Sequence, residues 1–334
     1  MAKKDALFMG IDGGQSGTRC VIINSLGEVV GVGQGDGIDF VLAPGGKTAL
    51  AKALSSAVEG ALSHTPRKFC AAFLGLSGVT PDGLQVETVK NVCQDIFESE
   101  RLDIASDSTA AWAGALACKP GIVLISGSGS IALGVNHNDE TARAGGWGYI
   151  FGDEGSGFGI AKDALKMTLH SLDVNQPLES FKSAFQAEFP HIPIESLTKA
   201  FYAGNITRAQ FALVTKRLAG HAARGNRAAI ELFRSSARML ACKVVGTAHK
   251  LTWPSDVITW SPVGGVFNCG SVILAPLEEY LKQLDRTYRY EMHPPLLPPA
   301  AGAALLAAKK YLQLKELDSR LSRRVKAGLE NKVV

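Results

Sequence analysis

The sequence lacks long apolar runs and paired cysteines. No segment approaches the ~18 uninterrupted apolar residues of a membrane-spanning helix, and no short apolar region with a cleavage site follows the first residues. The six cysteines are scattered, without a Cys-x-x-Cys pair or a histidine at zinc-ligand spacing, which argues against a disulfide framework and a zinc site. We expect a cytoplasmic protein with reduced thiols and no membrane partner.

Aromatic residues and surplus charge are also scarce. Aromatic residues make up 7% of the chain, and 35 basic against 31 acidic side chains give a net charge of +4. Nucleic-acid-binding proteins combine a basic stripe with a recognisable module, and no helix-turn-helix, zinc finger or aromatic-rich ribonucleoprotein motif is present. The basic cluster between Arg320 and Lys326 is interpreted as a solvated helix end, so no nucleic-acid partner is expected.

Strand-like and helix-like segments alternate along 334 residues, enough for two hydrophobic cores. The predicted strands are 5–11, 18–24, 28–33, 69–75, 102–106, 121–126, 130–136, 256–261 and 286–291, with a further β-like stretch near 140–146. The predicted helices are 47–63, 85–98, 108–118, 156–172, 177–188, 194–203, 207–224, 226–251, 272–284 and 301–325.

The order of these segments repeats in outline after residue 120, which predicts an α/β fold of two related lobes. The first lobe is expected over 1–118 and the second over 119–298, where a helical insertion fills roughly 156–251. A small-residue helix in 299–334 is expected to pack back on the first lobe.

Two glycine-rich, hydroxyl-bearing turns lie between strand-like runs. They are Asp12–Arg19 (DGGQSGTR) and Ser126–Ser130 (SGSGS). A Walker loop ends in Gly-Lys-Ser/Thr before a helix, and a dinucleotide fingerprint also leads into a helix, so neither motif applies. Glycine and serine turns instead offer backbone N–H groups, unobstructed by Cβ atoms, that wrap phosphate oxygens. We predict that both turns bind the phosphates of a nucleotide.

Two aspartates stand where strand-like runs end. Asp12 ends the first run, and Asp107 follows 102–106 at the start of a predicted helix. An aspartate at this place can simply cap backbone N–H groups, and the local sequence supports capping and a catalytic role equally. Ligands of open α/β sheets collect at the carboxyl ends of strands. Phosphoryl transfer needs a base and a carboxylate-held Mg²⁺, and the two aspartates offer both functions.

Two further glycine-rich segments are candidate ligand contacts. Five glycines lie between 145 and 155, within Gly145–Gly148 (GGWG) and Gly152–Gly155 (GDEG), where an open backbone lets a ligand approach main-chain amides. The segment Ser261–Phe267 (SPVGGVF) follows a predicted strand and precedes a helix, which makes it a second candidate nucleotide contact.

In this order the segments resemble the actin-like ATPase superfamily, and within it the N-acetylglucosamine kinase group of the BadF/BadG/BcrA/BcrD ATPase family. The matching segments are Gly10–Ser16, Asp107–Ala111, Leu124–Ser130, Gly145–Ser156 and Val263–Phe267, followed by the Pro-x-x-Gly-Ala-Ala pattern from Pro299. The resemblance implies a two-lobed actin-like, ribonuclease H-like fold in which each lobe is a mixed sheet flanked by helices. It also implies that the lobes close around both substrates.

The resemblance implies a role for each motif. Asp107 is then the general base on the sugar hydroxyl, and Asp12 positions Mg²⁺ through water. The implied ATP-binding residues are Asp12, Gly13, Gly14, Ser16, Gly127, Ser128, Gly129, Ala222, Gly264 and Gly265. The implied sugar-binding residues are Asp39, Asp107, Gly146, Trp147, Gly148 and Asp153. The implied activity is ATP-dependent phosphorylation of an amino sugar, with N-acetylglucosamine, converted to its 6-phosphate, first among the acceptors and glucosamine and N-acetylmuramic acid as others.

Two departures from the family pattern leave the sugar open. Gln15 stands where many members have a third glycine, and Gly37-Ile38-Asp39 replaces the Gly-x-x-Asn setting of a sugar-contacting asparagine. Ile38 cannot bond a hydroxyl, whereas Asp39 can accept a hydrogen bond but not donate one when ionised.

Two other functions stay open at this point. One is an ATPase that activates an acyl-CoA reductase or dehydratase through an iron–sulfur cluster held by paired cysteines, although Cys118 is the one cysteine near the second turn. The other is a nucleotide-dependent sugar sensor without turnover. A homodimer is a further expectation, for which the apolar face of 226–251 is a candidate surface.

Overall fold

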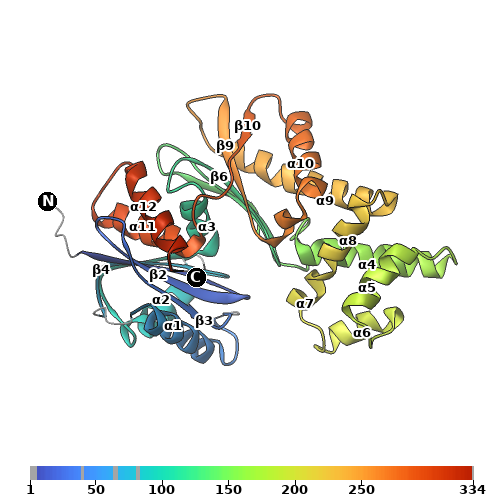
Figure 1. The fold of residues 1–334 in the computed structure, drawn as a ribbon, viewed down its shortest axis with the longest axis horizontal. Helices are drawn as coiled ribbons and strands as arrows, with labels where there is room; N and C mark the ends of the chain where they lie inside the picture. The colour runs from blue at the N-terminus through green and yellow to red at the C-terminus, as the bar shows by residue number, and fades with distance from the viewer. Residues whose placement is uncertain (1–5, 39–40, 63–66, 80–82, 333–334) are drawn as a thin grey trace. The chain divides into compact units, whose positions relative to one another are not determined.

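Ten strands form two five-stranded sheets within residues 6–38, 41–62, 67–79 and 83–332, which are the parts described by this computed structural model (Figure 1). The chain divides into two compact units, each containing one sheet. Unit 1 is Met1–Val123 with Pro294–Val334, and unit 2 is Leu124–His293.

The sheet of unit 1 has the order β3-β2-β1-β4-β5. Its strands are β1 (Leu7–Gly14), β2 (Gly17–Asn24), β3 (Val29–Gly35), β4 (Lys68–Leu76) and β5 (Glu98–Ser106). β2 is antiparallel to β1 and β3, whereas β4 is parallel to β1 and β5. The parallel strands β1, β4 and β5 therefore end at one edge of the sheet.

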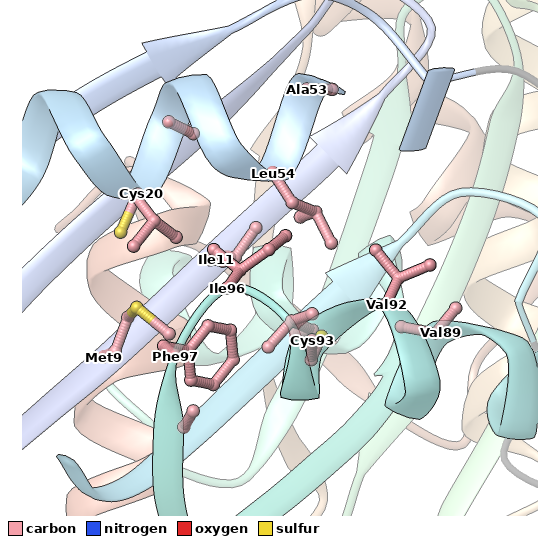
Figure 2. Packing of buried hydrophobic residues seen from close by; sticks show 14 of the residues in the cluster. Met9, Ile11, Cys20, Ala53, Leu54, Val89, Val92, Cys93, Ile96 and Phe97 are labelled. Atoms are coloured by element: carbon pink, nitrogen blue, oxygen red, sulfur yellow. The ribbon is translucent and has the colours of Figure 1, made fainter. Parts of the chain in front are cut away.

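Helices cover both faces of this sheet, which explains why β1 is apolar on successive residues rather than on alternate ones. The helices of unit 1 are α1 (Gly46–Leu62), α2 (Gln85–Gln94), α3 (Asp107–Ala115), α11 (Pro299–Tyr311) and α12 (Ser319–Glu330). Figure 2 shows the core in which Met9 and Ile11 of β1 pack with Leu54 of α1 and Val92 of α2.

The small-residue helix α11 packs against β1, β4 and α3. A Cβ atom on Gly10 would lie 2.1 Å from the backbone nitrogen of Ala304, and one on Gly302 would lie 1.9 Å from the backbone nitrogen of Gly114. Larger side chains would force these backbones apart, so the glycines and alanines permit the close approach.

The sheet of unit 2 has the order β10-β9-β6-β7-β8. Its strands are β6 (Gly121–Ser126), β7 (Ser130–Val135), β8 (Thr141–Gly145), β9 (Val257–Val263) and β10 (Arg289–Met292). Its helices are α4 (Gly157–Asp173), α5 (Glu179–Glu188), α6 (Leu197–Tyr202), α7 (Arg208–Ala212), α8 (Val214–Ala223), α9 (Arg227–Ala248) and α10 (Ser271–Leu284), with the 3₁₀ turns η1 (Ile194–Ser196) and η2 (Gly265–Cys269). Ring contacts among phenylalanines join the helices of the insertion: Phe158 stacks on Phe201, and Phe211 makes tilted contacts with both.

Three helix predictions need correction. The helix expected over 301–325 is two helices, because Gln313 adopts a positive φ after α11 and the Asp318 side chain caps α12. The helix expected over 85–98 ends at Gln94, since Glu98 already pairs with Lys68 of β4. The helix expected over 207–224 is divided between α7 and α8 at Leu213.

The apolar face of α9 lies inside unit 2. Leu232, Phe233, Leu240 and Val244 are buried, and α9 contacts α8, α10, β7 and β8. This face is therefore occupied by the unit's own core and does not support the surface expected for a second copy. Within the described residues, every helix is too short or too polar to span a bilayer.

Candidate functional site

In unit 1 the candidate site lies at the carboxyl ends of three parallel strands. Asp12 lies near the end of β1, opposite Gly75 of β4, and Asp107 follows β5 as the first residue of α3. The backbone nitrogen of Ser77, directly after β4, donates to the Gly13 oxygen at 2.8 Å. Sheet pairing thus brings together two aspartates that are 95 residues apart in the sequence.

The environment of these aspartates favours their protonated forms. Burial, and after it the negative charge of Asp107, raises the pKa of Asp12 to about 7, while Arg19 acts in the opposite direction. Burial also raises the pKa of Asp107, although hydrogen bonds from the Ser108 backbone, at 2.8 Å to Oδ1, and from the Ser77 side chain oppose the shift. A carboxylate with a raised pKa is a stronger base than a solvated one.

The first glycine turn contains one glycine packed by side chains and one that faces open space. A Cβ on Gly13 would lie 2.7 Å from Leu76 Cδ2 and 2.9 Å from Ile38 Cδ1, whereas one on Gly14 would meet no described heavy atom within 4 Å. The backbone nitrogen of Ile38 donates to the Gly14 oxygen at 2.9 Å. Ser16 is exposed. Gly14 and Ser16 are therefore accessible to a ligand.

The Ile38 side chain lies in the core, and its backbone nitrogen donates to the Gly14 oxygen. Ile38 therefore supports the turn. Asp39, the predicted sugar contact next to it, lies outside the described residues.

In unit 2 the second glycine turn is held by the segment that precedes α4. Ser126 Oγ donates to the Gly155 oxygen at 2.8 Å, and the Gly157 nitrogen donates to the Gly127 oxygen at 2.8 Å. A Cβ on Gly127 would meet no described heavy atom within 4 Å. The turn is therefore fixed from one side while Gly127 stays open.

Asp153 links this turn to the Gly-Asp-Glu-Gly segment. Its carboxylate is buried and accepts a hydrogen bond from the Ser130 nitrogen at 3.0 Å. A Cβ on Gly129 would lie 3.0 Å from Asp153 Oδ2, and Asp153 itself has a φ of 63°. Glycine at 129 thus makes room for the carboxylate, and the left-handed backbone of Asp153 indicates a tightly fixed loop.

The Gly-Gly-Trp-Gly segment contacts the same turn. The Gly146 nitrogen donates to the Ser130 oxygen at 3.1 Å. Trp147 is 67% exposed, and the Arg143 guanidinium lies 4.4 Å from its ring centroid. An exposed indole held by a cation offers a flat apolar surface to a ligand such as a sugar ring.

The predicted adenosine residues lie in two neighbouring parts of unit 2. Gly264 packs on the second turn: its φ is 115°, and a Cβ there would lie 2.3 Å from the Ser126 oxygen. Ala222 instead lines a cavity of about 210 Å³ with Ile230, Arg234, Ser271, Val272 and Pro276. The helix α8, which carries Ala222, contacts η2, which begins at Gly265, so these residues belong to one region.

Two residues at the site were missed by sequence reasoning. Ser77 directly follows β4, so the rule that identified Asp12 and Asp107 also applies to it. Lys243 lies on the buried face of α9. The sequence indicates its burial, because Lys243 has helical spacing from Ser236, Leu240 and Thr247 on the same face. Its Nζ donates to Ser130 Oγ at 2.8 Å and to the Glu154 oxygen at 2.7 Å.

Metal binding at this site would involve few protein ligands. No group of three or more His, Cys, Asp or Glu side chains in the described residues is arranged to hold a metal ion. The pair Asp12 and Asp107 is a two-carboxylate set. Cys118, the cysteine considered for an iron–sulfur cluster, is buried.

The chain is similar to known proteins over most of its length. Residues 9–307 match the model of the BadF/BadG/BcrA/BcrD ATPase family. A Clostridium acetobutylicum protein named N-acetylmuramic acid/N-acetylglucosamine kinase is 28% identical over 203 residues, which are 60% of this chain and 65% of that protein. The N-acetyl-D-glucosamine kinase of Dictyostelium discoideum is 30% identical over 187 residues, 52% of this chain and 57% of that protein. The matched segments span less than two thirds of either relative.

A solved structure has the same fold. A candidate N-acetylglucosamine kinase of Chromobacterium violaceum superposes with a TM-score of 0.68 at 24% identity, covering 92% of this chain and 100% of that chain. Two mixed five-stranded sheets with flanking helices form the fold of actin-like sugar kinases, so the fold class predicted from the sequence is confirmed.

Proposed function

The chain belongs to the BadF/BadG/BcrA/BcrD ATPase family, and from that premise we propose that it uses ATP to phosphorylate a hydroxyl group of an amino sugar. N-acetylglucosamine occurs in the names of both curated relatives, which supports an N-acetylated amino sugar as the acceptor. The observation that carries the proposal is the pair of partly buried aspartates, Asp12 and Asp107, beside the first glycine turn.

Asp107 is the proposed general base. Its raised pKa makes the carboxylate a better proton acceptor for a hydroxyl that attacks the γ-phosphate. The Ser108 nitrogen and the Ser77 hydroxyl orient the carboxylate, and their hydrogen bonds prevent its pKa from rising further. The N-cap of α3 is Ser106, and Asp107 uses Oδ1 to accept from the Ser108 nitrogen, so its second carboxylate oxygen is left for proton transfer.

The residues present fit a magnesium ion accompanied by ATP. Mutual repulsion contributes to the raised pKa of Asp12, so a divalent cation would favour both carboxylates in their charged forms. Mg²⁺ is commonly held by one or two carboxylates together with substrate phosphates and water, which suits a site with two carboxylates. When bound, it would neutralise charge on the phosphates. Asp12 is the residue proposed to position the ion, through water.

The phosphate contacts are assigned by accessibility, and the adenosine and sugar contacts follow the segments predicted from the sequence. We assign phosphate contacts to the open glycines Gly14 and Gly127 and to the hydroxyls of Ser16 and Ser128. The cavity beside Ala222, with Gly264 and Gly265 in the same region, is assigned to adenosine. Gly146, Trp147, Gly148 and Asp153 are assigned to the amino sugar.

A substrate panel tests the proposed function. ADP release from Mg²⁺-ATP would be measured with glucose, galactose, glucosamine, N-acetylglucosamine and N-acetylmuramic acid, against a blank without sugar. We expect the highest kcat/KM with an N-acetylated amino sugar and a blank rate at least about 100-fold lower, because an uncatalysed water lacks the positioning that the sugar hydroxyl receives. Turnover with glucose or galactose alone, or a blank rate equal to the sugar-dependent rate, would contradict an amino sugar kinase.

A further inference from the structure

Lys243 is a buried lysine that contacts two of the predicted ligand-binding segments through its ammonium group. Its side chain is 7% exposed. Nζ donates to Ser130 Oγ at 2.8 Å, to the Glu154 main-chain oxygen at 2.7 Å and to Glu154 Oε2 at 3.1 Å. Ser130 ends the second glycine turn and Glu154 belongs to the Gly-Asp-Glu-Gly segment, so one cation joins both.

The aliphatic part of Lys243 contacts a third segment. A Cβ on Gly145 would lie 2.6 Å from Lys243 Cε, and Gly145 has a φ of 80°. The Gly-Gly-Trp-Gly backbone therefore lies directly against the lysine stem. The same segment is tied to the turn by the hydrogen bond from the Gly146 nitrogen to the Ser130 oxygen, 3.1 Å long.

Ser130 is the shared partner of these contacts. Its hydroxyl accepts from Lys243 and donates to the Glu154 oxygen at 2.7 Å, its nitrogen donates to Asp153 at 3.0 Å, and its oxygen accepts from Gly146. A shift of the turn at Ser130 thus changes hydrogen bonds to both segments at once. Packed polar networks of this kind have a small number of discrete arrangements rather than a continuum.

Burying a charged lysine at this position costs free energy. Burial lowers the pKa of Lys243, and hydrogen bonding and charge from Glu154 offset part of that shift. Apolar side chains of similar volume commonly replace buried ion pairs without loss of stability. Lys243 is thus better explained by what its three donor positions hold than by filling the core of unit 2.

We propose that Lys243 is a positioning residue that couples the second glycine turn to the loop 145–154, so that a nucleotide bound at the turn changes the setting of Trp147 and Asp153. The inference rests on the proposed function, because it assumes that the turn binds nucleotide phosphates and that the loop binds the sugar. The expected consequence is that nucleotide occupancy prepares the loop for its second substrate.

Trp147 provides a direct optical readout of this coupling. The side chain is 67% exposed, and its Cβ lies beside Gly152, at 3.1 Å from a Cβ built there, so its surroundings change when the loop moves. The experiment titrates the full chain with ADP and Mg²⁺ and records tryptophan emission. The Trp147→Phe variant, which keeps the other tryptophans, gives the background to subtract. No sugar and no turnover are needed.

Three substitutions test the role of the lysine. Lys243→Met keeps the length of the side chain and removes its hydrogen-bond donors. Lys243→Arg keeps a positive charge and donors. Lys166→Met is the matched control on α4, where the lysine side chain is 75% exposed. In Lys243→Met we expect the Trp147-dependent change to fall at least about 5-fold, with the ADP Kd raised less than about 10-fold. Lys243→Arg should keep at least half of the change, and Lys166→Met all of it.

The remaining outcomes distinguish failure of the coupling from failure of the proposed function. Binding of ADP without a Trp147-dependent change in the natural chain, or an undiminished change in Lys243→Met, overturns the coupling and leaves the proposed kinase standing. Failure of the natural chain to bind ADP overturns the proposed function, and the coupling with it. If Lys243→Met does not fold, Ser130→Ala removes the shared hydroxyl and should lose at least half of the change; a full response in Ser130→Ala overturns the coupling.

Discussion

A comparison of three aspartates shows how local partners set the chemistry of single residues. Burial raises the pKa of Asp12 to about 7, and Asp107 adds to the shift by repulsion. Burial acts in the same direction on Asp285, but hydrogen bonds from Tyr290 and Thr287, together with His249, outweigh it and lower the pKa of that residue. Tyr290 donates to Asp285 at 2.6 Å. Asp285 is thus a stabilised structural anion, whereas the groups around Asp12 and Asp107 do not outweigh the effect of burial.

The raised pKa of Asp12 predicts how stability depends on pH. An unfolded aspartate titrates near ~3.9, so the folded chain holds this proton more tightly, and stability from Asp12 is lost as the pH rises from about 4 through about 7. Asp12→Asn removes this cost. Without nucleotide and Mg²⁺, the Tm of Asp12→Asn should exceed that of the natural chain by roughly 3–6 °C at pH 8, and the difference should shrink toward pH 5.

Ligand provides the control for this prediction. Adding ADP and Mg²⁺ at pH 8 should stabilise the natural chain more than Asp12→Asn, because the ionised carboxylate gains a cation. A Tm difference that is constant with pH, or that grows toward acid, would be evidence against a raised pKa at this position.

The residues that the sequence identified are those that end strands or occupy short glycine-rich turns. Asp12, Asp107 and Ser126–Ser130 were predicted as ligand contacts because the ends of strands and glycine-rich turns have local sequence patterns. Lys243 was not found, because its partners Ser130 and Glu154 are 113 and 89 residues away. The packing of Ile38 against Gly13 could not be predicted from the sequence either, because it depends on how the turn folds.

At the scale of elements, α11 fixes the helix that begins with Asp107. Gly302 of α11 meets Gly114 of α3 backbone to backbone, and the Leu297 nitrogen donates to the Gly114 oxygen at 3.1 Å. Because α3 is short, a displacement at Gly114 is transmitted to its first turn. The C-terminal segment thereby contributes to the position of the proposed base.

Two glycine-to-alanine changes in helices should therefore have opposite effects. A Cβ at Gly302 would lie 1.9 Å from the Gly114 nitrogen, whereas one at Gly246 of α9 has Ala144 Cβ, at 3.8 Å, as its nearest contact. Overpacking at Gly302→Ala should cost at least about 2 kcal/mol, whereas Gly246→Ala should gain about 0.5–1 kcal/mol from helix propensity.

Thermal unfolding followed by circular dichroism measures both changes. We expect Gly302→Ala to lower the Tm by roughly 5 °C or more and Gly246→Ala to raise it by roughly 1–3 °C. Equal and small effects of the two changes would mean that α11 and α3 do not approach as closely as the structure has them.

Most strands and helices were predictable from sequence patterns, and the errors occur where long-range contacts override them. β5 begins at Glu98, in a charged stretch with no strand-like alternation, because β4 supplies a pairing partner. The break between α11 and α12 depends on the positive φ of Gln313, which a sequence of ordinary helix formers does not reveal.

At the scale of the whole molecule, unit 1 is built from both ends of the chain, with unit 2 inserted between them. Local patterns predicted two α/β lobes because the order of strands and helices repeats in outline. The register that places Asp12 opposite Gly75 and Leu76 opposite Ser106 arises from sheet pairing, which one sequence does not specify. The sequence therefore indicates candidate residues, and the structure supplies the pairing that sets their positions within each unit.

The proposed kinase activity requires Asp107 to accept the proton of an amino sugar hydroxyl as ATP transfers its γ-phosphate. The measurement is kcat of Asp107→Asn with N-acetylglucosamine and Mg²⁺-ATP, together with the Kd for ATP. Asp103→Asn is the matched control, an aspartate of the same strand region that pairs with Arg101 at 2.8 Å and Lys310 at 3.2 Å. We predict at least a ~100-fold lower kcat for Asp107→Asn with the Kd for ATP changed less than about 3-fold, and near-normal turnover for Asp103→Asn. Near-normal turnover in Asp107→Asn would mean that Asp107 is not the general base.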